Sequence, residues 1–286
     1  MKQQNELLPD KAFEVRQTAD GSQTLYSDRV QEHYHSTFGA LQESRHIFIQ
    51  AGLLEAHRRK TSGLQAAGNN QTAATALTTE ATQATRTTQV AGKTKSAEAT
   101  QVAGTARSSN LPLKVFELGL GTGLNALLTM LEAGNLQLNL SYDCIEAYPL
   151  SPDLVQALNF PALFSEQDQK KAAAVLDFIH ATEWNVRHTD PASHTRFTKF
   201  RGDFTSFEPT ERYDLVYWDA FSPEKQAEMW TEELFASMYE HMETGGILVS
   251  YCAKGEIRRR LQRAGFGVER LQGPPGKREI IRAVKL

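Results

Sequence analysis

Three glycines that alternate with larger residues stand in the run FELGLGTGLN, residues 116–125. They are Gly119, Gly121 and Gly123, and an acid, Glu117, precedes the first of them by two positions. Glycine permits positive φ and lets the backbone approach a ligand closely, so the run predicts a binding loop. The G-x-G-x-x-G pattern of dinucleotide sites and the Gly-Lys-Ser/Thr of P-loops are both missing. Because Glu117 would repel a phosphate, we expect a ligand with an ammonium or sulfonium group.

Two further acids follow apolar runs that predict strands, Glu146 after LSYDCI and Asp203 after TRFTKFRG. Ligands of open α/β sheets bind beyond the carboxyl ends of the strands. Glu146 is placed to accept hydrogen bonds from ribose hydroxyls, and Asp203 from an adenine amino group. Either acid alone is explained equally well as a helix cap or a solvated strand end. Together with the loop, they predict S-adenosylmethionine as the ligand.

A fourth strand end, WDAFSPEKQAEMW, is where we expect the reacting atom. Asp219 follows the apolar run 215–218, which would place its carboxylate in a cleft beside the sulfonium group. Phe221 is available to stack on a flat substrate. The alternative is that Asp219 caps the next helix, but the large aromatic residues around it favour a functional role.

These residues need a scaffold, and strands that alternate with helices after residue 111 predict one. We expect an α/β fold, a doubly wound Rossmann-like methyltransferase sheet that is mostly parallel. The final strands, FGVERLQ and REIIRAVKL, are joined by GPPGK and predict an antiparallel C-terminal hairpin. Helices are predicted in LNALLTMLEAG, in residues 152–180, in TEELFASMYEHM and in KGEIRRRLQRAG.

The rest of the chain divides into two segments, so that the domains are 1–60, 61–110 and 111–286. In the first, residues 13–27 predict a hairpin about Asp20-Gly21, and residues 39–59 predict a helix broken at Gly52. Residues 61–110 hold twelve Thr and twelve Ala and repeat the run TQVAG. This segment has too little apolar surface to bury to offset the conformational entropy that it would lose on ordering. We therefore predict that it is a disordered insertion.

Charge and cysteine content limit the possible partners and compartment. The net charge is only −3, but residues 251–286 carry ten bases against three acids. This end predicts an anionic partner, although a solvated helix face is the simpler explanation. The two cysteines allow no zinc spacing and fit a reducing compartment. The polar N-terminus, MKQQNELLPD, predicts no secretory signal, and no apolar run is long enough to predict a transmembrane helix.

Several of these runs together resemble the methyltransferase domain of the MnmC family. The similar runs are WDAFSPEKQAEMWTEELF, GGILVSYCAKGEIRRRLQRAGF, GKREI, ELGLGTGLN and GALQESRHIFI. The resemblance covers residues 20–58 and 112–286. Two features depart from it: Gln226 replaces the usual asparagine, and the Thr/Ala-rich insertion is additional.

The resemblance implies a stand-alone, cytoplasmic enzyme that uses S-adenosylmethionine. Its substrate would be the primary amine of 5-aminomethyl-2-thiouridine at the tRNA wobble position, with a separate enzyme as a possible supplier of the aminomethyl group. The chemistry requires no metal, and Asp219 would orient the amine and accept its proton. Two alternatives remain, an aminopropyl- or other small-amine transferase on the same fold and a non-catalytic RNA-binding module.

The predicted site therefore has three groups of residues. Asp219 is the predicted catalytic residue. The predicted cofactor-binding residues are Glu117, Gly119, Gly121, Gly123, Asn125, Glu146, Asp203 and Phe204. The predicted substrate-binding residues, with the basic ones meeting tRNA phosphates, are Phe221, Arg258, Arg259, Lys277 and Arg278.

Overall fold

The computed structural model describes residues 12–63 and 111–286. Of these residues, 12–57 and 112–286 belong to one compact unit, and 58–63 with 111 belong to a second. The predicted disordered insertion, residues 61–110, lies outside the described residues from position 64 on, and residues 61–63 are helical. Within the described ranges, no helix is both long and apolar enough to cross a membrane.

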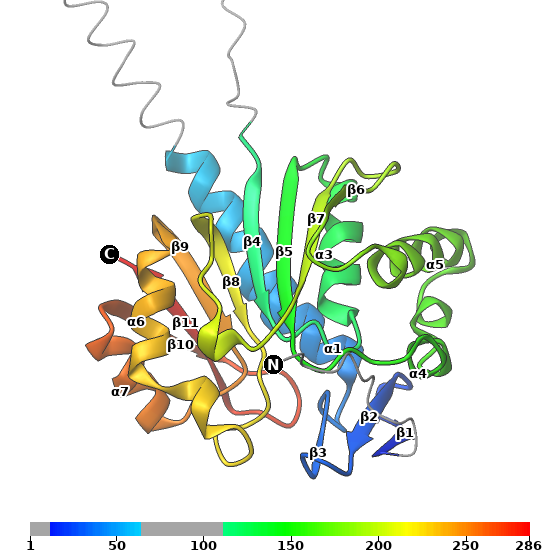
Figure 1. Ribbon diagram of the computed structural model, residues 1–286, viewed down its shortest axis with the longest axis horizontal. Coiled ribbons are helices and arrows are strands. Elements are labelled where there is room, and N and C mark those ends of the chain that lie inside the picture. Colours follow the sequence, from blue (N-terminus) through cyan, green and yellow to red (C-terminus); the bar gives the residue numbers. More distant parts are fainter. Residues whose placement is uncertain (1–11, 64–110) are drawn as a thin grey trace, which may run out of the picture. The chain divides into compact units, whose positions relative to one another are not determined.

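An eight-stranded sheet organises the first unit, in the order β10-β11-β9-β8-β4-β5-β7-β6 (Figure 1). Its strands are β4 (Leu113–Leu118), β5 (Leu140–Glu146), β6 (Arg187–Thr189), β7 (Arg196–Arg201), β8 (Tyr213–Trp218), β9 (Met242–Ser250), β10 (Phe266–Gln272) and β11 (Glu279–Lys285). Neighbours from β7 through β9 run parallel, whereas β6, β10 and β11 pair antiparallel. The predicted doubly wound sheet and its C-terminal hairpin are confirmed. The strand order reverses between β4 and β8, which is where such sheets bind ligands.

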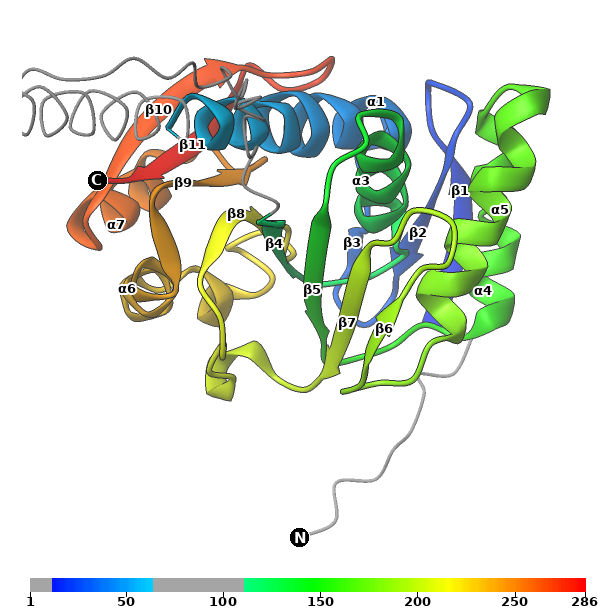
Figure 2. The ribbon, with the colours of Figure 1, turned by 90° about the horizontal axis from the view of Figure 1, so that it is seen from above.

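Helices cover both faces of this sheet. They are α1 (Ala40–Ser44), η2 (Arg45–Leu54), α3 (Leu124–Asn135), α4 (Pro152–Ala157), η3 (Phe160–Leu163), α5 (Glu166–Ala181), η4 (Phe204–Ser206), η5 (Ala227–Trp230), α6 (Glu232–Glu240) and α7 (Gly255–Arg263). Figure 2 shows α1, α3 and α5 on one side of the sheet and α6 and α7 on the other. Two buried hydrophobic clusters correspond to these two faces.

The apolar sequence of β4 explains how the sheet is held between these layers. Val115 packs into the cluster on the α3 side, while its neighbour Phe116 packs into the cluster on the α6 side. Consecutive side chains of a strand point to opposite faces, so a strand covered on both sides needs apolar residues directed to each face. The same requirement explains the apolar run in β8, where Tyr217 and Trp218 divide between the two clusters.

One sequence-based expectation was wrong, that Gly52 breaks its helix, and two features of the structure go beyond the sequence analysis. Gly52 does not break its helix but lies inside the π-helical segment η2. A Cβ built there would lie 3.1 Å from the Tyr217 ring and 3.2 Å from Val249, so glycine lets this helix approach the sheet. Residues 152–180 form three helices, because Asn159 takes φ 47° and Ser165 begins α5 as its N-cap. The short edge strand β6 was not predicted.

A second, three-stranded sheet precedes α1 and consists of β1 (Phe13–Gln17), β2 (Gln23–Ser27) and β3 (Glu32–His33). Strands β1 and β2 pair antiparallel, which confirms the predicted hairpin. This sheet lies next to the end of the large sheet at which the parallel strands finish (Figure 1). The backbone nitrogen and hydroxyl of Ser222 both donate to Glu32 Oε2, at 3.0 and 2.9 Å, and so join it to the loop after β8.

Candidate active site

The glycine loop forms the turn between β4 and α3. Gly119, Gly121 and Gly123 have φ values of 84°, 51° and 77°, a region that favours glycine. The nitrogen of Gly119 donates to the Ile145 carbonyl at 3.0 Å, and that of Gly121 to Glu146 Oε2 at 2.9 Å. The loop is therefore fixed to the end of β5, with its backbone exposed toward the switch point.

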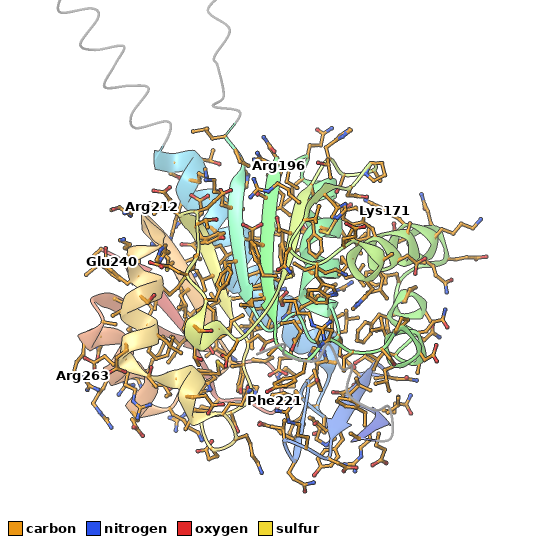
Figure 3. All side chains as sticks on the ribbon, viewed as in Figure 1. Lys171, Arg196, Arg212, Phe221, Glu240 and Arg263 are labelled. Carbon is orange, nitrogen blue, oxygen red and sulfur yellow. The ribbon has the colours of Figure 1, made fainter. Side chains whose placement is uncertain are left out.

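A cavity of about 670 Å³ opens at this switch point. Its lining includes predicted residues from every group, namely Gly119, Gly121, Asn125, Glu146, Asp203, Phe204, Asp219, Phe221 and Lys277. Figure 3 shows Phe221 at the end of the sheet that faces β1–β3, whereas Arg196 and Arg212 lie at the opposite end. The sequence-based expectation that the strand ends meet at one place therefore agrees with the geometry.

Glu146 lies half-buried at the edge of the cavity. Its Oε1 accepts a hydrogen bond from the nitrogen of Tyr148 at 2.7 Å, and its Oε2 accepts the one from Gly121. Burial raises the pKa of this carboxyl, and the backbone donors act against that rise. Each oxygen keeps acceptor capacity for a hydroxyl, because a carboxylate oxygen has two lone pairs.

Glu117 does not line the cavity, contrary to the expected direct contact with the ligand. Its side chain is 0% exposed in β4. Oε1 accepts from Asn125 Nδ2 at 3.0 Å, and Oε2 accepts from the Tyr142 hydroxyl at 2.7 Å. Burial holds the pKa of Glu117 well above its usual range. The structure thus places Glu117 beneath the site, where it orients Asn125.

Asn125 connects this buried acid to the cavity. Its Nδ2 donates both to Glu117 Oε1 and to Asp219 Oδ2, the latter at 2.8 Å. Its Oδ1 is buried and has no hydrogen-bond partner within the described part of the chain. A buried acceptor without a donor is costly, so this oxygen is suited to receive a donor from a ligand. An ammonium group such as that of S-adenosylmethionine fits the requirement.

Asp219 directly follows β8 and projects into the cavity. It is not a helix cap, because the next helical segment, η5, begins eight residues later at Ala227 with Gln226 as its N-cap. Burial raises the pKa of Asp219 to about 7, the Asn125 hydrogen bond lowers it, Glu43 raises it and Lys277 lowers it. An acid with this pKa exchanges protons readily near neutral pH.

Asp203 caps a short helix and is also part of the cavity lining. Its Oδ1 caps η4 by accepting from the nitrogen and hydroxyl of Thr205, at 2.9 and 2.8 Å. The residue also lines the cavity. Phe204 follows it, 5% exposed, with its ring centroid 5.5 Å from that of Trp218.

Phe221 is half-buried, and its ring meets that of Tyr34 edge-on at 5.0 Å between centroids. Its nitrogen donates to Gln226 Oε1 at 3.1 Å, and its carbonyl accepts from Trp230 Nε1 at 2.7 Å. Gln226, one of the departures noted in the sequence, therefore holds the loop that carries Phe221.

The predicted basic residues do not act as one group. Lys277 lines the cavity, with Nζ 3.2 Å from Glu43 Oε1 and 4.6 Å from the Tyr251 ring centroid. Arg258, Arg259 and Arg278 lie outside the lining. Much of the basic end is neutralised locally by the ion pairs Lys254–Glu224, Arg260–Glu256, Arg263–Glu232, Arg270–Glu279 and Arg282–Glu269.

Sequence reasoning missed the N-terminal side of the cavity. A Cβ on Gly121 would lie 3.1 Å from Tyr34, so this ring covers the glycine loop. His35 Nε2 lies 2.7 Å from the Thr122 hydroxyl, and burial lowers the pKa of His35 to about 4. Glu43 holds Lys277, as described above. The one signal in the sequence was the aromatic pair Tyr34-His35 in a polar turn, and no spacing rule links it to residue 121.

Comparisons with known proteins agree with this geometry. Residues 178–286 match the family described as S-adenosyl-L-methionine-dependent methyltransferase. The chain is 31% identical over 186 residues to the tRNA 5-methylaminomethyl-2-thiouridine biosynthesis bifunctional protein MnmC of Pseudomonas savastanoi pv. phaseolicola, which covers 62% of this chain and 28% of that protein. It is 32% identical over 171 residues to the MnmC of Nitrosospira multiformis, covering 58% and 27%. The matched region thus spans less than a third of these relatives.

Among solved structures, MNMC2 from Aquifex aeolicus is similar with a TM-score of 0.64 and 21% identity, over 98% of this chain and 72% of that one. This similarity shows a shared fold. The fold, the cavity at its switch point and the family match define the class, an S-adenosylmethionine-dependent methyltransferase domain of Rossmann-like architecture. Within that class, the relatives described above are MnmC proteins, which this chain resembles over 58–62% of its length.

Proposed function

We propose that this chain is an S-adenosylmethionine-dependent N-methyltransferase of the aminomethyl group of the modified wobble uridine, 5-aminomethyl-2-thiouridine, in tRNA. The observation that carries the proposal is that Asp219 and the glycine loop share one cavity and are linked through Asn125 Nδ2, 2.8 Å from Asp219 Oδ2. A cofactor held by the glycine loop would therefore have this carboxylate in the same cavity as its transferable methyl group. The relatives' printed role in tRNA 5-methylaminomethyl-2-thiouridine biosynthesis supports the substrate.

Five residues of this chain would hold the cofactor. Asn125 Oδ1 would accept from the ammonium group, and the backbone of Gly119 and Gly121 would border the amino-acid portion. Glu146 would accept from the ribose hydroxyls and Asp203 from the adenine amino group. When bound, S-adenosylmethionine supplies an electrophilic methyl group, which the amine lone pair takes as the carbon–sulfur bond breaks.

Asp219 would serve the amine. The methylated nitrogen must lose one proton, and the Asp219 carboxylate would accept it directly or through one water molecule. A base with a pKa of about 7 is well matched to work near neutral pH. The hydrogen bond from Asn125 Nδ2 goes to Asp219 Oδ2. We therefore assign the other carboxylate oxygen, Asp219 Oδ1, to the amine. Fixing the amine at attack distance would contribute much of the rate enhancement.

Phe221 and Tyr34 would position the uridine ring. The two rings meet edge-on, and both residues line the cavity. Phe221 lies two positions after Asp219 in the chain, and the Tyr34 ring lies over Gly121. The aminomethyl group would come from a separate enzyme acting earlier on the same nucleotide. We infer that this chain works on tRNA after that step, in the cytoplasm.

The test is methyl incorporation from labelled S-adenosylmethionine into bulk tRNA that carries the unmethylated aminomethyl group, followed by nucleoside analysis. The proposal predicts label in one wobble nucleoside, recovered as the methylaminomethyl form. Label in another nucleoside, or transfer to putrescine or spermidine in preference to tRNA, would contradict it.

A further inference from the structure

The cavity mouth carries exposed aromatic rings. Among the described residues, two aromatic side chains count as exposed large hydrophobic groups, Phe38 at 57% and Tyr148 at 42%. Both line the cavity. A lone exposed aliphatic side chain is ordinary on a protein surface, but a large aromatic ring at the mouth of a ligand cavity is a candidate contact.

Phe38 is held rigidly in a short turn before α1. Its nitrogen donates to Ser36 Oγ at 3.2 Å, and the nitrogen of Gly39 donates to the Ser36 carbonyl at 3.1 Å. The nitrogen of Ser36 in turn donates to Glu43 Oε2 at 2.9 Å. These bonds fix the backbone from which the exposed ring projects.

The ring of Phe38 rests on the backbone of Gly276, in the link between β10 and β11. A Cβ built on Gly276 would overlap the Phe38 ring, so only glycine lets the ring lie there. The remaining surface of the ring stays open to solvent. A flat apolar surface supported from below and open above is the geometry of a stacking platform.

Contacts among its neighbours place this platform on the substrate side of the cavity. Gly276 is followed by Lys277, whose Nζ lies over the Tyr251 ring. The Tyr251 hydroxyl donates to the Ala220 carbonyl at 2.9 Å, next to Asp219. Tyr148, in contrast, lies on the cofactor side, where its backbone nitrogen donates to Glu146 Oε1. The guanidinium carbon of Arg29 lies 3.6 Å from the centroid of the Tyr148 ring and already covers that ring.

The chemistry around Phe38 suits a nucleic acid. Lys277 and Arg278 follow Gly276 directly in the chain, and Lys277 lines the same cavity as Phe38, with its Nζ 3.2 Å from Glu43 Oε1. Proteins that bind single-stranded nucleic acid combine such cations with aromatic rings on which bases stack. A protein partner would instead require a contiguous exposed apolar patch. None of the exposed large aliphatic side chains of the described residues lines the cavity.

We propose that Phe38 stacks on the base of a nucleotide next to the modified uridine, in a single-stranded RNA loop. This inference rests on the proposed function, because it takes the reacting uridine to be in the cavity. Phe38 is a binding residue here and touches no reacting atom. Its stacking would hold the loop open while the uridine turns inward toward Asp219.

The experiment uses the full chain and a synthetic anticodon stem-loop with 5-aminomethyl-2-thiouridine at the wobble position. 2-Aminopurine replaces the nucleotide 5′ to it in one probe and the nucleotide 3′ to it in another. We expect the wild-type protein to quench one of the two probes. In Phe38→Ala the quenching should disappear and binding should weaken about 5- to 100-fold, the range for loss of one stacked base. Phe38→Trp should restore both, whereas Phe38→Leu should not.

Leu136→Ala is the matched control, because Leu136 is 41% exposed and lies outside the cavity lining. It should bind and quench as wild type. Unchanged quenching and affinity in Phe38→Ala, with methylation of the probe intact, would overturn the inference and leave the proposed function standing. Loss of quenching in Phe38→Ala while the wild type binds but does not methylate the probe would support the inference and contradict the proposed function. Failure of the wild type to bind the probe would overturn both.

Discussion

The two halves of the cavity are built in different ways. Most of the cofactor half comes from one continuous stretch, in which β4, the glycine loop, α3 and β5 bring Gly121, Asn125 and Glu146 together, and Asp203 is added from the end of β7. The substrate half comes from three segments far apart in the chain, around Phe38, Phe221 and Lys277. The first half depends on backbone shape and the second on packing between distant side chains. The two halves should therefore respond differently to substitution.

The largest effect on cofactor binding is expected in the cofactor half. Gly121→Val would force a branched side chain into φ 51° and against Tyr34, 3.1 Å from the new Cβ. We expect S-adenosylmethionine affinity to fall by at least about 100-fold, measured by isothermal titration, since a left-handed non-glycine residue and a steric overlap each cost about 1–3 kcal/mol. Gly134→Val, in α3 with Lys171 Nζ at an ordinary 3.5 Å, is the control and should bind normally. Equal affinity in the two variants would show that the loop does not contact the cofactor.

The same difference explains how much the sequence could predict. Strand β4 was predictable because Val115 and Phe116, which pack on opposite faces, are both apolar, as burial on two faces favours. The glycine loop was predictable because local backbone conformation dictates the residue type. The contact between Tyr34 and Gly121 spans 87 positions, and no local pattern records it. Gly52 was misread for the same reason, since its packing partner, Tyr217, is distant in the chain.

The position of each strand end could be predicted from the sequence, but the hydrogen bonds of the acidic side chains there could not. Asp219 was placed correctly in the cavity from the end of an apolar run. Glu117 was assigned a ligand contact, but its side chain is completely buried and lies outside the cavity lining, where it bonds with Tyr142 and Asn125. Side-chain direction inside a strand depends on which face each residue presents, and β4 is covered on both.

The next largest effect concerns pH and the substrate half. Only the ionised form of Asp219 would accept a proton, and its pKa is raised to about 7. Single-turnover methyl transfer should therefore fall about tenfold per pH unit below 7 and level off above it, at saturating cofactor. A rate that stays flat between pH 5 and 8 would mean that Asp219 does not titrate in the reaction.

Charges around Asp219 should shift its pKa by smaller amounts and in opposite directions. Lys277 lowers the pKa of Asp219 and Glu43 raises it, while Glu117 lies beneath, joined through Asn125. Lys277→Met should therefore move the acidic limb of the pH–rate profile to higher pH, and Glu43→Gln should move it to lower pH. A few-fold change in rate at pH 7, in opposite directions, is expected. Shifts of the same sign would point to a general loss of structure.

The smallest effect is expected outside the cavity. Arg258→Ala with Arg259→Ala should weaken tRNA binding a few-fold and reduce the salt dependence by about 1–2 in log–log slope, with S-adenosylmethionine affinity unchanged. Arg263→Ala is the control on the same helix, because its guanidinium is already paired with Glu232 at 2.6 Å. If the two proteins have the same salt slope in a filter-binding titration, Arg258 and Arg259 do not meet phosphates.

The measurement that tests the central claim most directly is cofactor titration and single-turnover transfer to tRNA on one variant, Asp219→Asn. Asparagine keeps the shape and still accepts from Asn125, but it cannot take a proton. We predict near-normal S-adenosylmethionine affinity together with a loss of about 10²–10⁴-fold in methyl transfer, the usual contribution of a positioned acid–base group. Wild-type turnover in this variant would contradict the catalytic assignment of Asp219.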